Sequence, residues 1–593
     1  METTLDTAAY SWYNVRMDRK DIIHRLCWHL PVLALVGTIA LLACCRGCGR
    51  KKPAMDPAVA AAYAAVPAPG KLCPLPAWTM VTNDVAARKT VSPRDGSVAA
   101  RLLAHGAVEL PCAFSRVRTE RACWDFAVAG DFKDKHGLAF DFWCGDVTQF
   151  TGFSVYFKSG AGWYQAPFSP LEERQWHRIV ISRARAKGTE GSPTGWHAIS
   201  TVRICGWRGG TNDTQLGVAN LAYAEPPPVR TPEQIAAADR ADREWAARQP
   251  AKKGEWRGFW CHNYRGLSGG KTWDDTVRLL KENGFNAVLP NLAWAGTAFY
   301  PSEVLPVAPV VAKIGDQLAA CLSACRKYGI ECHVWNICWN LGHHATKAQM
   351  AALSAAGRTQ VRFDGTARPG WLCPSHPDNL ALEIRSFLEL AQRGVDGVHL
   401  DYIRYPDESH CFCSGCRTRF EAQYALSLTN WPTQVRQDPD VKAKWREFRI
   451  TNITALVKGV ATRIHKDMPG VKVSAAVFQN PETNPGAIGQ DWADWCRAGY
   501  LDFVCPMDYN YDSPVAFKGV VFAQKRALAG VGAKTLLRPG IGLNCWPDRA
   551  RDIRMAVGEI LAVREAGLDG FCFFDLGARA EALLPVLHTG PTR

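Results

Sequence analysis

The chain has 593 residues, 47% of them apolar, and carries a formal net charge of +14. This length allows several domains, and the apolar share suffices for a large core. No run of Lys and Arg is interleaved with aromatic residues, so the positive charge does not indicate a nucleic-acid groove. The 22 Cys are too dilute in a chain of this length for a disulfide scaffold.

The first predicted element is an export or anchor segment at residues 1–52. An apolar run from Leu26 to Cys45 follows four basic residues, Arg16, Arg19, Lys20 and Arg25. This order is typical of a secretory signal or a membrane anchor, and a buried globular helix is the alternative. Within it, Leu41-Leu-Ala-Cys44 resembles a bacterial lipobox, in which Cys44 would be lipidated. We expect an exported protein held at the bacterial cell envelope, as a lipoprotein or through one membrane span.

Residues 53–70 are rich in Ala and Pro and are predicted to form a tether. Residues 71–224 then show short strand-like runs separated by Gly and polar turns, with no helical segment between them. This pattern favours a β-sandwich, and it resembles the jelly-roll modules that accompany many glycosidases. Its aromatic residues either form a sugar-binding platform or fill the core: Trp163, Tyr164, Trp176 and Trp207.

A proline-rich boundary, Glu225-Pro-Pro-Pro-Val229, opens a predicted linker helix region at residues 225–252. From residue 253 to 593, strand-like and helix-like segments alternate. This alternation predicts a (β/α)8 barrel. An open nucleotide-binding sheet is disfavoured, because Gly266-Leu-Ser-Gly-Gly270 does not fit the phosphate-binding fingerprint. The eight predicted strands are Trp256–Cys261, Asn286–Asn291, Ile330–Asn336, Gly397–Tyr402, Val471–Phe478, Phe503–Asp508, Thr535–Ile541 and Gly570–Asp575.

All eight predicted strand ends carry polar or aromatic groups, and in a barrel of this kind those ends form the active-site face. Aromatic faces stack on sugar rings, amide, His and Arg groups bind hydroxyls, and glycoside hydrolysis needs two carboxyl groups beside the scissile bond. The candidate substrate-binding residues are His262, Asn291, Trp294, His333, Trp335, Asn336, Arg404, Tyr509, Asn544, Trp546 and Asp575.

The ordered series of strand motifs resembles the bacterial glycosyl-hydrolase-like family ten. The matching pieces include Trp256-Arg-Gly-Phe-Trp260, Trp371-Leu-Cys-Pro374 and Val395-Asp-Gly-Val-His-Leu-Asp-Tyr402. The resemblance covers roughly residues 255–587. It implies a barrel that hydrolyses glycosidic bonds, with some members acting on the glycan strands of peptidoglycan. We therefore expect a glycoside hydrolase that acts on a cell-envelope or extracellular polysaccharide and requires no cofactor.

Among the acids, Asp401 is the predicted nucleophile or base. Arg404 or His333 would hold its carboxylate in the ionised form. The predicted proton donor is Asp508, with Glu482 as the second choice, and Asp575 is expected to bind hydroxyls or to play a structural part. Strand four also resembles that of family 18 chitinases, but Ile403 stands where their catalytic Glu would be. This departure argues against a chitinase-type mechanism.

Two alternatives to hydrolysis by paired carboxylates remain at this point. One is a barrel that binds carbohydrate without cutting it. The other is a metal-dependent hydrolase with an ion near His262, His333 and Asp401. Separately, Cys411, Cys413 and Cys416 have Cys-x-Cys-x2-Cys spacing next to His410. This spacing predicts either a structural Zn²⁺ site with a ligand from elsewhere in the chain, or free thiols or a disulfide.

Overall fold

The computed structural model describes residues 57–67, 73–74, 79–80, 101–102, 107–116, 120–509, 511, 513–545 and 552–593. The predicted anchor, Cys44, Trp546 and residues 53–56 and 68–70 of the predicted tether lie outside these residues, while the rest of the tether contains a short helix, α1 (Pro57–Ala64). No helix among the described residues combines the length and the hydropathy that a membrane crossing needs.

Two antiparallel six-stranded sheets occupy the region before residue 225. They enclose one apolar core, to which Phe140, Phe153 and Phe157 contribute. The first sheet contains β3 (Arg101–Leu102), β4 (Val108–Cys112), β12 (Thr214–Ala224), β6 (Gly137–Cys144) and β9 (His177–Ser182), with β1 (Cys73–Pro74) paired to β12. The second contains β10 (Lys187–Glu190), β8 (Gly162–Phe168), β7 (Phe150–Ser159), β11 (Ile199–Arg208), β5 (Arg121–Gly130) and β2 (Thr79–Met80).

The aromatic residues singled out in this region are already engaged by other side chains. The guanidinium of Arg203 lies 4.6 Å from the centroid of the Trp163 ring, and that of Arg121 lies 5.4 Å from the Trp207 ring. Tyr164 stacks on Trp196 at 4.3 Å. A sugar-binding role for these residues stays a prediction.

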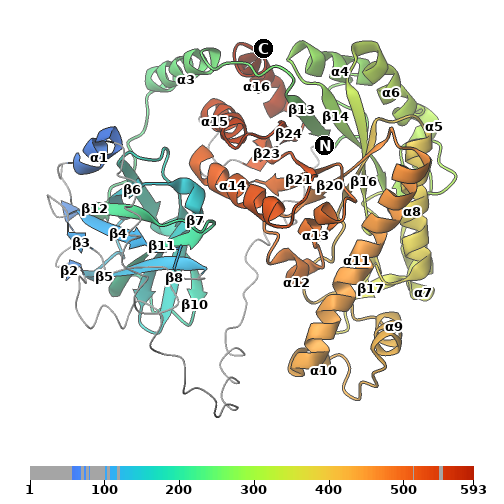
Figure 1. Cartoon of the computed structure of the whole chain (residues 1–593), viewed down its shortest axis with the longest axis horizontal. Coiled ribbons are helices and arrows are strands. Elements are labelled where there is room, and N and C mark those ends of the chain that lie inside the picture. The colour runs from blue at the N-terminus through green and yellow to red at the C-terminus, as the bar shows by residue number, and fades with distance from the viewer. Residues whose placement is uncertain are drawn as a thin grey trace, which may run out of the picture. The chain divides into compact units, whose positions relative to one another are not determined.

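The second region begins with helix α3 (Pro232–Ala247) and continues into a closed barrel (Figure 1). Thr231 and Gln234 form a capping box at the start of α3. The barrel strands are all parallel, and β13 pairs with both β24 and β14, so the sheet closes on itself. In chain order they are β13 (Trp256–Cys261), β14 (Ala287–Trp294), β16 (Glu331–Ile337), β19 (Gly397–Asp401), β20 (Lys472–Val477), β21 (Phe503–Asp508), β22 (Leu536–Leu537) with β23 (Gly540–Gly542), and β24 (Gly570–Phe574). The predicted (β/α)8 barrel is confirmed.

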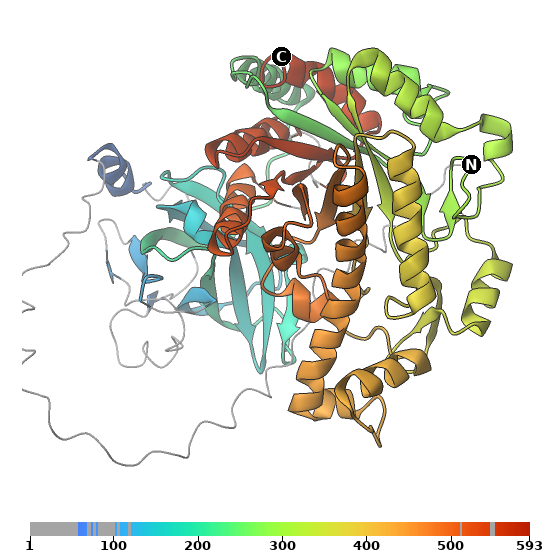
Figure 2. The same cartoon turned by 45° about the vertical axis from the view of Figure 1, so that its right-hand side comes forward.

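Helices follow each barrel strand and pack around the outside, and α8 and α11 run side by side in Figure 2. The principal ones are α4 (Trp273–Glu282), α6 (Gln317–Tyr328), α8 (Pro377–Gln392), α11 (Pro439–Asp467), α13 (Trp492–Arg497), α14 (Pro514–Gly530), α15 (Asp552–Glu565) and α16 (Ala578–His588). Two strands are followed by long insertions. After β16 come α7 (Lys347–Ala355), β17 (Thr359–Val361) and β18 (Ala367–Leu372), and after β19 come α9 (Ser414–Tyr424) and α10 (Gln434–Gln437).

The floor of the barrel, at the amino-terminal ends of the strands, is closed by a cation between two rings. The guanidinium of Arg538 lies 4.2 Å from the Trp256 ring and 4.6 Å from the Phe503 ring. Asp569 pairs with this guanidinium at 2.7 Å. Because these groups are large and mutually bonded, they fill the foot of the barrel as a packed layer.

One layer higher, the imidazole of His399 links two strands across the interior. The indole N–H of Trp260 donates to His399 Nε2 at 3.1 Å, so Nε2 accepts and the ring proton lies on Nδ1. Nδ1 is 2.9 Å from Ser474 Oγ. Burial lowers the pKa of His399 well below its usual value, which keeps the ring neutral. This layer fixes Trp260 beneath the mouth of the barrel.

Candidate active site

Asp401 lies at the carboxyl end of β19 and faces the barrel interior. Its carboxylate accepts a hydrogen bond from the indole N–H of Trp335 at 3.0 Å and one from the backbone N–H of Tyr402 at 2.6 Å. Burial raises the pKa of Asp401 to about 6, although the two donors and the charge of Arg404 oppose this effect. The residue is 5% exposed. Asp401 therefore titrates closer to neutral pH than an exposed aspartate does, a property that suits an acid–base group.

The residue after Asp401 has an unusual backbone conformation. Tyr402 has φ = 56°, a left-handed value that is rare outside glycine, and its N–H turns back onto the Asp401 carboxylate. The Tyr402 ring contacts Trp371 at 5.7 Å, and Arg404 lies 4.8 Å from it. Arg404 also lies 4.7 Å from the ring of Phe478, so aromatic contacts on two sides hold this cation near Asp401.

Aromatic rings surround the position of Asp401. His262 stacks on Trp335 at 5.5 Å and contacts Trp294 at 6.4 Å. On the other side, Phe574 stacks on Tyr509 at 5.1 Å and approaches Trp335 edge-on at 6.4 Å. Rings in this arrangement offer the apolar faces that sugar C–H surfaces pack against.

A second carboxyl with a similar titration lies beyond Phe574. Asp575 follows β24, and the side-chain amide of Asn544 donates a hydrogen bond to its Oδ1. Burial raises the pKa of Asp575 to about 6. Asp575 follows Phe574 in the chain, and the Phe574 ring approaches Trp335, the residue that donates a hydrogen bond to Asp401. The sequence predicts that Asp575 binds hydroxyls or plays a structural part, and the raised pKa of its carboxyl also suits proton transfer.

Asp508 does not share this site, which corrects its predicted role as the proton donor. Its Oδ1 accepts a 2.7 Å hydrogen bond from Gln524 on α14, and the residue is only 1% exposed. Successive side chains along a strand point to opposite faces. Met507 therefore faces the interior, and Asp508 faces the helix layer. Burial raises the pKa of Asp508 well above its usual value.

Three predicted binding residues are buried and serve the scaffold instead. Asn336 donates to Ser386 on α8 at 3.1 Å, so it points away from the mouth. Asn291 donates to the backbone oxygen of Trp335 at 3.2 Å and is 1% exposed. His333 lies deeper in the barrel, 2.9 Å from Glu331, and therefore does not hold Asp401 in its ionised form.

The other candidates have mixed outcomes. His262, Trp294, Trp335, Arg404, Tyr509, Asn544 and Asp575 are near the mouth, as described above. Glu482 lies on the loop after β20 with an exposed side chain, and its backbone N–H bonds to Asn480. The predicted site does not include Trp371 or Phe574, although Trp371 belongs to one of the motifs that carried the family resemblance and Phe574 lies at the end of the eighth predicted strand.

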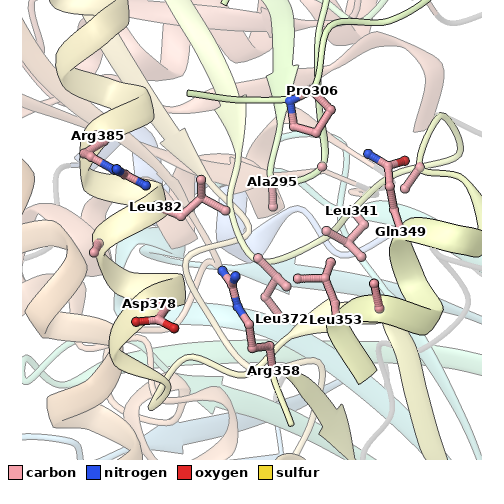
Figure 3. A pocket seen from close by; sticks show the side chains of 14 residues that line it. Ala295, Pro306, Leu341, Gln349, Leu353, Arg358, Leu372, Asp378, Leu382 and Arg385 are labelled. Atoms are coloured by element: carbon pink, nitrogen blue, oxygen red, sulfur yellow. The ribbon is translucent and has the colours of Figure 1, made fainter. Parts of the chain in front are cut away.

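A cavity of about 670 Å³ lies to one side, between α7 and α8 (Figure 3). Its walls are mainly apolar, with Leu341, Leu353 and Leu382 among them, and Arg358, Asp378 and Arg385 add charge. None of the predicted catalytic or substrate-binding residues lines it. It is therefore separate from the carboxyl groups at the barrel mouth.

Comparison with known proteins places the barrel in a family context. Residues 255–526 match the family model described as glycosyl hydrolase-like 10, which confirms the resemblance predicted from the strand motifs. The matched segment begins one residue before β13 and ends within α14. Over this range the chain is similar to that family.

A curated relative is the "S-layer-related protein" of Niallia circulans, 24% identical over 298 residues. This match covers 43% of the chain but only 18% of the relative, so the chain spans less than a fifth of that protein.

Three solved structures that match the chain are distant from it in sequence. The catalytic domain of a β-amylase from Paenibacillus polymyxa is 11% identical with a TM-score of 0.40, over 57% of this chain and 96% of that one. An agarase is 10% identical with a TM-score of 0.40, over 82% and 90%. A β-galactosidase from Bacillus circulans sp. alkalophilus is 16% identical with a TM-score of 0.39, over 54% and 50%. Likenesses of this strength say nothing about the reaction of this chain.

Proposed function

We propose that the barrel hydrolyses glycosidic bonds of a polysaccharide at the mouth formed around Asp401. The main support for this proposal comes from the environment of the Asp401 carboxyl. Burial raises its pKa to about 6, and it accepts hydrogen bonds from Trp335 and Tyr402. The match of residues 255–526 to a glycosyl hydrolase-like family supports the same reaction class.

The two carboxyl groups divide the work in this proposal. Asp401 accepts two N–H bonds, which favour its ionised form, so it attacks the anomeric carbon or activates a water molecule there. Asp575 accepts one amide bond and is less buried, and it gives its proton to the leaving oxygen. The rings of Trp335, Phe574 and Tyr509 hold the sugar between them.

The proposed substrate is a cell-envelope glycan, with peptidoglycan glycan strands as the first candidate. The description of the Niallia circulans relative as S-layer-related supports an envelope setting. The net charge of +14 also suits an anionic wall polymer. In this proposal the chain is exported and held at the envelope by its N-terminal segment.

A second candidate function is a barrel that binds a glycan without cutting it. Two observations favour it: Asp508 faces the helix layer, and Asp401 is only 5% exposed. The metal-dependent alternative has less support. Among the described residues, the only groups of three or more side chains placed to share an ion consist of cysteines.

Incubation of the purified chain with peptidoglycan and with plant and algal polysaccharides separates the two functions. Hydrolysis predicts new reducing ends and defined oligosaccharides by mass spectrometry. Asp401→Asn should lower the rate about 10²-fold or more, while it still sediments with the insoluble glycan. Full turnover by this variant would refute the role of Asp401, and co-sedimentation without any product from the native chain would support the binding function.

A further inference from the structure

Four buried cysteines converge beside the barrel, although they come from two separate insertions. Cys373 follows β18, in the insertion after β16, while Cys411, Cys413 and Cys416 lie between β19 and α9 or within its first turn. All four sulfur atoms lie within 4.8 Å of one another. The Cys373 sulfur is 3.4 Å from that of Cys416 and 3.8 Å from that of Cys413.

These distances suit one tetrahedral ion. Sulfur atoms at about 2.3 Å from a central Zn²⁺ lie roughly 3.8 Å apart. A disulfide needs only one pair of sulfurs at about 2 Å, and two disulfides would not bring all four atoms together. The four cysteines are free thiols here. A cluster of several iron atoms would hold its ligands farther apart than this group allows.

The backbone around the cluster also prepares it for thiolates. Cys413 is the N-cap of α9, and the N–H of Cys416 donates to its sulfur at 3.3 Å. The N–H of Val361 on β17 donates to the Cys411 sulfur at 3.4 Å. Arg419 lies 3.9 Å from the Cys373 sulfur and adds positive charge. Such donors around the ligands are the usual surroundings of a structural metal site.

We propose that Cys373, Cys411, Cys413 and Cys416 bind one Zn²⁺ ion in a closed structural site. Soft thiolates select Zn²⁺ over Mg²⁺ or Ca²⁺, and four protein ligands leave no open position for a reacting water. This proposal extends the three-cysteine prediction by its missing ligand, Cys373. It also removes His410 from the candidates, because the ligand atoms that lie within 4.8 Å of one another are the four cysteine sulfurs and include no nitrogen of that residue.

The ion would tie the two longest insertions of the barrel to each other. Trp371 stands two residues before Cys373, and its ring contacts Tyr402, whose N–H bonds to Asp401. Binding of Zn²⁺ at Cys373 therefore fixes the segment that supports the Tyr402 ring. The structural role of the ion does not depend on whether the barrel cuts glycans or only binds them.

Metal analysis of the full chain, purified without chelator, tests this site. We expect about one zinc per chain by plasma mass spectrometry. Titration with an organomercurial should release that zinc as the thiols react, and Co²⁺ exchanged into the site should show the absorption of a tetrahedral thiolate complex. A metal-free chain, bound iron in place of zinc, or disulfides among the four cysteines would overturn the proposal.

Variants locate the ion within the chain. Cys416→Ser and Cys373→Ser should reduce bound zinc about tenfold or more. Two buried controls should keep their zinc: Cys496→Ser, on α13, and Cys325→Ser, from a separate group of three cysteines with Cys321 and Cys332. Retention of zinc in both test variants would refute the assignment. If they do not fold, the Co²⁺ spectrum of the native chain still decides it, because four thiolate ligands give a stronger sulfur-to-cobalt absorption than the three that the other cysteine group can supply.

Discussion

The indole nitrogen of Trp335 lies 3.0 Å from Oδ2 of Asp401, and the two residues belong to adjacent strands, β16 and β19. Trp335 therefore contributes in two ways. Its ring offers an apolar face at the barrel mouth, and its N–H stabilises the charged form of the carboxylate. Burial works in the opposite direction, and the pKa of Asp401 near 6 is the balance of the two effects.

Trp335→Phe is expected to move the pH dependence of the reaction. Phenylalanine keeps an aromatic face but has no N–H, so the ionised form of Asp401 loses a donor and its pKa rises further above the present value of about 6. Loss of a hydrogen bond to a charged carboxylate raises the pKa of that group by about 1–2. Because Asp401 acts in its ionised form in the proposed reaction, the acidic limb of kcat/KM should move to higher pH by that amount.

Trp273→Phe is the matched control, because Trp273 is 3% exposed and its indole N–H has no hydrogen-bond partner among the described residues. Its pH profile should stay unchanged. An unmoved acidic limb in Trp335→Phe, with the fold intact, would mean that this donor does not tune Asp401.

Asp508→Asn should leave the reaction unchanged. The carboxyl faces α14 and bonds to Gln524, and an amide keeps an oxygen that accepts the same hydrogen bond. We expect activity within about twofold of the native chain and a change in unfolding free energy within about 1.5 kcal/mol. Side-by-side progress curves with Asp575→Asn, which should lose about 10²-fold, measure this contrast. The reverse ranking would restore Asp508 as the proton donor.

Glu383 makes the stability of the barrel depend on pH. It is 1% exposed on α8, and burial raises its pKa from 4.5 to about 8, although the backbone N–H of Trp339 donates to it at 2.7 Å. The native state therefore favours the protonated acid. The stability due to this preference is complete below pH 4.5 and is lost as the pH rises towards 8.

Glu383→Gln should remove this dependence. At pH 8.5 the variant should be more stable than the native chain by about 2–5 kcal/mol, and at pH 5 the two should agree within about 1 kcal/mol. Urea denaturation of both proteins at each pH gives the comparison. Parallel stability curves across this range would show that Glu383 titrates normally in the fold.

Glu255 is the centre of a buried ion network at the start of β13. Arg257 bonds to it at 2.9 Å and Arg564 at 2.7 Å, and its own side chain is fully buried. Glu255→Gln leaves two guanidinium groups without their counter-charge. We expect a loss of about 3–5 kcal/mol in unfolding free energy, measured by chemical denaturation.

The exposed pair Arg243–Asp239 supplies the control for that measurement, because both of its side chains are about half exposed. Asp239→Asn should change the unfolding free energy by at most about 1 kcal/mol. Equal losses in the two variants would contradict a special contribution from the network at Glu255.

The strands of the barrel were predictable, because each combines a short apolar run with flanking turn residues. The predicted Trp256–Cys261 and Phe503–Asp508 agree with β13 and β21 at both ends. The face on which each side chain lies was not predictable. Residues 503–507 of β21 are all apolar, so no alternation within the strand distinguishes the side of Met507 from that of Asp508.

The residues of the candidate site also differ in how far the sequence alone could predict them. Asp401 and its neighbours Tyr402 and Arg404 follow one strand end, and a local motif was enough to find them. Cys373 is 38 residues before Cys411 in the sequence, and only the fold of the two insertions brings their sulfurs together. The part played by Asp575 likewise depends on Asn544 and on burial, neither of which a motif records.

The packed layer at the amino-terminal ends of the barrel strands limits how a long polymer can bind to this molecule. Arg538 lies between the rings of Trp256 and Phe503 and pairs with Asp569. These side chains close the barrel at the amino-terminal ends of its strands. A glycan strand cannot thread through the axis from one end to the other. Under the proposed function, the glycan must lie across the open end or insert a terminus and withdraw it by the same route, so substrate and product enter and leave at the same end of the barrel.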